Sequence, residues 1–76
     1  MSNPYLKALS EELNYGIEKM RNLQFTIGEF QNDSPNVDGI NGKEISKLID
    51  RAIHSINEAT LQVGMLNDFV KEVNDE

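Results

Sequence analysis

The chain has 76 residues, which limits it to one domain, and it contains one histidine and no cysteine. These counts exclude a disulfide framework and the usual zinc ligand sets. Thirteen acidic against seven basic residues give a net charge of −6, which argues against nucleic-acid binding through phosphate neutralisation and favours basic partners.

The sequence has no apolar run of membrane-spanning length, and its start lacks a basic and then hydrophobic signal segment. We therefore expect no membrane insertion and a cytoplasmic location. If the chain is exported, we expect a route that uses no cleaved signal peptide.

A first helix is predicted over about residues 4–31. Ser2 and Asn3 can cap it, and Pro4 suits its first turn. Its apolar residues follow gaps of three and four in alternation, which is the heptad spacing of a helix lying along another helix. This predicted seam comprises Leu6, Leu9, Leu13, Gly16, Met20, Leu23, Ile27 and Phe30. Glycine at position 16 indicates either a close approach of the facing backbone, which we favour, or a mild bend.

Residues 32–42 are dense in turn formers, and Asn41 or Ser34 can cap the helix predicted over about 43–73. The seam of this second helix comprises Ile45, Ile49, Ala52, Ile56, Ala59, Val63, Leu66, Val70 and Val73. A short loop between two long helices makes them antiparallel neighbours. The predicted fold is therefore all-α: one coiled-coil-like, antiparallel two-helix hairpin spanning residues 1–76.

Several apolar residues lie outside the two seams. Leu61, Met65 and Phe69 form a ridge at four-residue spacing on the second helix, and Tyr15 and Phe25 lie off the seam of the first. They either broaden the stripes or bind another chain. We favour binding, because two helices without a disulfide or metal have little core. We expect these five residues to contact a helical partner or a second copy, completing a four-helix bundle.

The sequence does not predict catalysis. The turn lacks the bidentate acid of a calcium loop: with Gly39 at the invariant glycine position, Ile45 falls where that acid belongs. His54 has only Glu58 at ligand spacing, and no serine has a histidine and an acid arranged around it. We therefore expect no enzyme activity, catalytic residue, metal site, cofactor or small-molecule substrate.

An acidic helical hairpin with glycine in its turn resembles the small WXG-motif proteins of type VII secretion, and more closely the short helical partners encoded beside LXG toxins. Ile40-Asn41-Gly42 stands in the place of Trp-x-Gly, with isoleucine for tryptophan. Phe69 is followed four residues on by Val73, where that family carries an acid. The resemblance implies a non-enzymatic targeting or chaperone role, in which the hairpin pairs with a secreted effector to aid its export.

Two other functions fit a short, acidic, cysteine-free helical chain. One is a phage- or mobile-element-type inhibitor that binds and blocks a host protein. The other is a self-associating structural protein or assembly chaperone. All three are forms of protein–protein binding.

Overall fold

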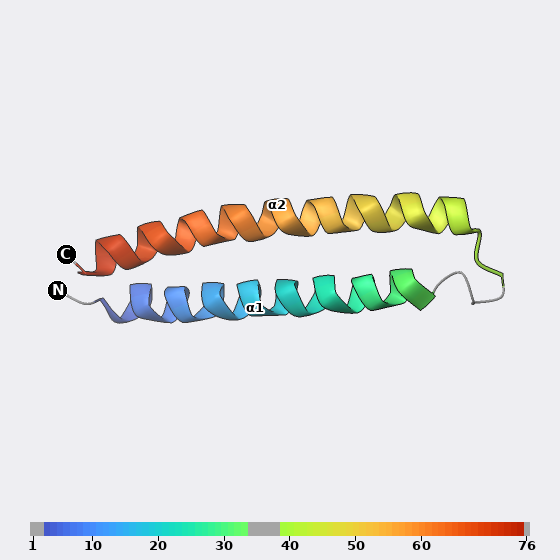
Figure 1. The fold of residues 1–76 in the computed structure, drawn as a ribbon. Helices are drawn as coiled ribbons and strands as arrows, with labels where there is room; N and C mark the ends of the chain where they lie inside the picture. Colours follow the sequence, from blue (N-terminus) through green and yellow to red (C-terminus); the bar gives the residue numbers. More distant parts are fainter. Residues whose placement is uncertain (1–2, 34–38, 76) are drawn as a thin grey trace.

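A computed structural model describes residues 3–33 and 39–75 of the chain. It contains two helices, α1 (Pro4–Asp33) and α2 (Gly42–Asp75), which lie antiparallel with both chain ends at the same end of the hairpin (Figure 1). The rod measures 57 × 15 × 13 Å, and no strand occurs in the described ranges. The predicted all-α two-helix fold is confirmed. Residues 34–38 of the predicted turn lie outside the described residues.

Each helix begins at an asparagine cap. Asn3 Oδ1 accepts hydrogen bonds from the backbone N–H groups of Tyr5 at 2.9 Å and Leu6 at 3.4 Å. Asn41 Oδ1 accepts from Lys43 at 3.0 Å and Glu44 at 3.1 Å. These bonds satisfy N–H groups that the first turn of a helix leaves unpaired. They confirm the capping predicted for Asn3 and Asn41, whereas Ser34 lies outside the described residues.

Two hydrogen bonds between the helices set their register. The Asn3 N–H donates to Asn74 Oδ1 at 2.7 Å, and the Ser10 hydroxyl donates to Asn67 Oδ1 at 2.8 Å. The two pairs are one heptad apart on both helices, so these residues occupy equivalent positions, which we label a in the heptad a–g. The same register puts Ile17 opposite Thr60 and Gln24 opposite Ile53.

The d positions form the second line of contact, and all of them are apolar. Their side chains are buried or half-buried, and among the described residues Ile49 and Val70 are the only buried apolar ones. The d residues are Leu6, Leu13, Met20 and Ile27 in α1, and Ile49, Ile56, Val63 and Val70 in α2. A contact of this size is a thin core for a chain of this length.

The predicted seams are half wrong as a description of the hairpin contact. Their d residues face the other helix. The other residues of the predicted seams are at g positions, one position before the a residues that also face the other helix. Leu66 is 48% exposed, whereas Asn67 is 3% exposed. In α1, Leu23 is half exposed, and Gln24 lies nearer the interface. Polar a residues are tolerated there because several of them hydrogen-bond across the contact.

Gly16 also differs from its prediction. A Cβ atom built on it meets no atom within 4 Å, so the predicted close approach of the facing backbone is wrong within the hairpin. Gly16 lies at the edge of the contact with α2.

Neither helix, over the ranges given above, has a segment long and apolar enough to cross a membrane.

Candidate interaction surface

One long side of the hairpin is lined by apolar residues at the g positions of both helices. In an antiparallel pair, equivalent heptad positions lie on the same side of the plane through the two axes, so both g lines border one face. We call this surface the g face. It comprises Leu9, Gly16, Leu23 and Phe30 of α1, and Ile45, Ala52, Ala59, Leu66 and Val73 of α2.

The g face is partly open to solvent in the isolated hairpin, where Leu9, Gly16, Ile45 and Ala52 are half-buried. Leu23, Phe30, Leu66 and Val73 are exposed large apolar side chains, although each borders the other helix. The c positions lie next to the g positions around the helix. Two exposed apolar residues at c positions of α2, Leu48 and Phe69, therefore widen the face. A continuous apolar surface of this length is typical of a site that another protein covers.

The opposite side of the hairpin has a different chemistry. Its e positions carry polar or charged side chains or glycine, and we call this surface the e face. It comprises Lys7, Asn14, Arg21 and Gly28 of α1, and Lys43, Asp50, Asn57, Gly64 and Lys71 of α2.

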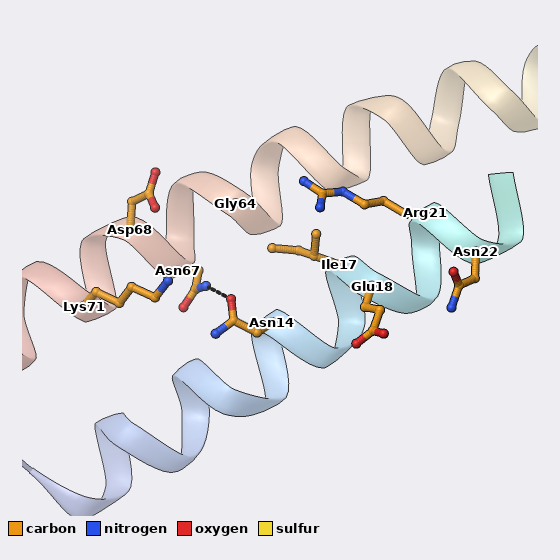
Figure 2. Close-up of a pocket in the computed structure, with 9 residues that line it drawn as sticks. All are labelled: Asn14, Ile17, Glu18, Arg21, Asn22, Gly64, Asn67, Asp68 and Lys71. Atoms are coloured by element: carbon orange, nitrogen blue, oxygen red, sulfur yellow. Dashed lines mark hydrogen bonds between the residues drawn. The ribbon is translucent and has the colours of Figure 1, made fainter. Parts of the chain in front are cut away.

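A shallow groove of about 610 Å³ runs along the e face between the helices. Figure 2 shows the residues that line it, including Arg21 and Asn14 from α1 and Gly64 and Lys71 from α2. The groove is lined mostly by polar and charged side chains. It is open at Gly64, because glycine brings no side chain to its wall. The g face has no comparable lining of charged groups.

Asn67 is the buried polar side chain of the hairpin contact. Its Nδ2 group donates to Asn14 Oδ1 at 2.7 Å (Figure 2), while its Oδ1 atom accepts from Ser10. No buried side-chain nitrogen or oxygen in the described ranges lacks a partner. A satisfied asparagine at an a position fixes register and orientation in coiled coils, so we assign this cluster a structural role.

This cluster was not predicted from the sequence, because half of each predicted seam lies one position away from the a residues. A usable signal was the repetition of short polar residues at heptad spacing. Asn3 and Ser10 are seven apart in α1, and Asn67 and Asn74 are seven apart in α2.

The five residues predicted to bind a partner are all exposed, but they do not form one surface. Leu61, Met65 and Phe69 lie along α2, whereas Tyr15 and Phe25 lie on α1. Met65 and Tyr15 occupy f positions, which point away from the other helix, so they lie on opposite sides of the rod. Phe69 alone borders the g face.

Tyr15 has a partner within its own helix. Lys19 Nζ lies 5.3 Å from the centre of the Tyr15 ring, at cation–π distance and one helical turn away. This contact gives Tyr15 a local role.

His54 is exposed on α2. Within the described ranges, no group of three or more histidine, cysteine or acidic residues is arranged to hold a metal ion.

Comparison with protein-family models, with curated proteins and with solved structures finds no match to this chain. Its function is therefore argued from the chemistry of the hairpin surfaces.

Proposed function

We propose that this chain is a non-enzymatic protein–protein interaction module that docks through its g face onto helices of another protein chain. The observation that carries the proposal is the composition of that face. Charged residues make up 26% of the sequence, so about two of nine ordinary positions would be charged. None of the nine described g positions is charged.

The spacing of the g face supports a helical partner. Its residues recur every seven positions on each helix, so they present a straight line of side chains along the rod. Such a line interdigitates with the ridge of another helix lying nearly parallel to it. An irregular partner surface would not match a repeat sustained over the length of the rod.

The more specific role that we propose is that of a small helical partner of a secreted effector. It is supported by the acidic hairpin architecture and by the Ile40-Asn41-Gly42 turn. Asn41 is the α2 cap and Gly42 the first α2 residue. Side-by-side pairing with a helical effector domain would use the g face. An inhibitor of a basic target would use the acids of the b and f positions instead, such as Glu18, Glu58 and Asp68.

Capture of a partner from the native host by three paired variants tests the proposal. Leu23→Glu with Leu66→Glu charges the g face. Gly28→Glu with Gly64→Glu adds the same charge to the e face, where an added Cβ meets no atom within 4 Å. Leu61→Glu with Met65→Glu charges the ridge on the outer side of α2.

We expect the native chain, the e-face variant and the ridge variant to capture the same helical protein, and the g-face variant to lose it while keeping its helical circular dichroism. Loss of the partner by the ridge variant alone would assign binding to the Leu61–Met65 surface and refute the proposal. Loss by the e-face variant alone would assign it to the polar groove.

A further inference from the structure

We infer that the g face closes on a second copy of this chain, giving a four-helix dimer whose two hairpins run in opposite directions about a two-fold axis near Ala59. The inference rests on the proposed function, because it takes the g face as the docking surface and makes a second copy its occupant when no other helical chain is bound.

The first observation behind this inference is the direction in which the apolar stripe on each helix points. The lines that face the other helix are a and d, but the lines that are wholly apolar are d and g. Seven heptad positions fill two turns, so neighbouring lines around the helix are roughly 50° apart. The apolar stripe is therefore turned by roughly 50° from the partner helix toward the g face.

This rotation fits a square arrangement of four helices. In a square bundle, the central axis lies about 45° from the direction of either neighbour, and apolar side chains point at that axis. The d and g lines would form the central core, and the polar a residues Ser10, Gln24 and Asn67 would lie on its outer flank. Two more helices are needed to complete this core, and a second copy supplies two helices with the same stripe.

Side-chain sizes along the g face fit a second copy that runs in the opposite direction. Small residues occupy the middle of the face, at Gly16, Ala52 and Ala59, and larger ones lie at Leu23 and Leu66. The register set by the Asn3–Asn74 and Ser10–Asn67 pairs places Ala59 level with Glu18. Ala59, the middle residue of the α2 line, therefore lies between Gly16 and Leu23, the middle pair of the α1 line.

One two-fold axis at this height, perpendicular to the rod, relates both lines to their copies. It brings Ala52 level with Leu66 of the second copy, so that a small residue meets a large one on each side of the axis. At the axis, Ala59 lies beside Ala59 of the second copy, and Gly16 lies between Gly16 and Leu23 of the second copy.

The area and the charges agree with a dimer of this kind. The long face of the rod measures 57 Å by 15 Å, which is large enough to accommodate the roughly 800 Å² per partner of a standard specific interface. The g lines bring no charge into it. Lys19, at a c position of α1, comes near Lys19 of the second copy at the rim, where solvent screens the repulsion.

A single introduced thiol tests this arrangement, because the chain has no cysteine. Ala59→Cys places a thiol near the axis, within reach of the same residue in the second copy. Gly64→Cys is the matched control, since it lies five residues away on the e face of the same helix. Circular dichroism of both variants verifies that the helices are intact.

We expect the native chain to sediment with the mass of two chains, and mild oxidation to link Ala59→Cys into a covalent dimer while Gly64→Cys stays largely unlinked. A native chain that sediments as a monomer overturns the inference. Its failure is distinct from that of the proposed function, which the g-face variants test through loss of a captured partner. A dimer linked through Gly64→Cys and not through Ala59→Cys also overturns the inference, because it would form through the e face.

Discussion

Asn67 is the polar residue that the described part of the hairpin buries in the contact between its helices. Its bonds to Ser10 and Asn14 satisfy both ends of its amide. Each of these bonds joins residues on different helices, so a shift of either helix by one residue would break both. The free energy of these bonds therefore stabilises this register against shifted ones.

We expect Asn67→Ala to lower the free energy of unfolding by about 1–3 kcal/mol, because it removes both bonds and leaves the Ser10 hydroxyl without its partner. The matched control is Asn57→Ala, which removes an exposed bond between the helices to Gln24 and should cost about 0.5 kcal/mol or less. Urea unfolding followed by circular dichroism measures both values. Equal losses would show that Asn67 has no special role in the contact.

The Asn41 cap gives a second prediction for a single residue. Asn41→Ala removes the acceptor for two N–H groups of the first turn of α2 and should lower stability by about 1 kcal/mol. Asn41→Asp keeps a side-chain oxygen at the same place and should retain most of the native stability. If alanine and aspartate behave alike in urea unfolding, the cap does not contribute.

At the scale of the helices, the caps and the d lines could be predicted from the sequence, because capping and heptad spacing are local patterns. The a lines could not, since several of their polar residues bond to partners far away in the sequence, such as Asn67 for Ser10 and Asn57 for Gln24. The heptad pattern gives the direction of an apolar stripe but does not state which neighbour it faces. The predicted seams consist of d and g residues. They therefore omit the a residues of the hairpin contact and include every residue of the g face.

The d line gives a prediction at this scale. Val63→Asp puts a charge between the helices, where it finds no partner, and should abolish most of the helical signal. Leu61→Asp is the control, because Leu61 is an exposed residue of the same helix and its loss should leave the hairpin folded. Circular dichroism at equal concentrations compares the two, and an unchanged spectrum for Val63→Asp would contradict the d assignment.

The glycines of the e face give another prediction at the scale of the helices. Gly64→Ala should raise stability by about 0.5–1 kcal/mol, since alanine favours the helix and the added Cβ meets no atom within 4 Å. Thermal unfolding would reveal the gain. A loss of stability would mean that something packs against Gly64 in solution and that the e face is not free.

At the scale of the whole molecule, association through the g face would account both for the thin core of the hairpin and for its exposed g residues. The hairpin buries only two apolar residues in its described part, Ile49 and Val70, which is little for a chain that has no disulfide to stabilise it. A second copy would bury the g residues and thereby supply the missing core. Association would then add to the stability of the folded hairpin, and that stability would depend on the concentration of the chain.

We propose that the hairpin is one half of a four-helix dimer joined through its g face. The most direct test is the melting temperature of the native chain, of Leu66→Glu and of Gly64→Glu, each measured over a hundredfold range of concentration. We expect the melting temperature to rise with concentration for the native chain and for Gly64→Glu, and we expect Leu66→Glu to melt lower, at a temperature independent of concentration. A native melting temperature that does not change with concentration, together with equal melting of Leu66→Glu and Gly64→Glu, would contradict it.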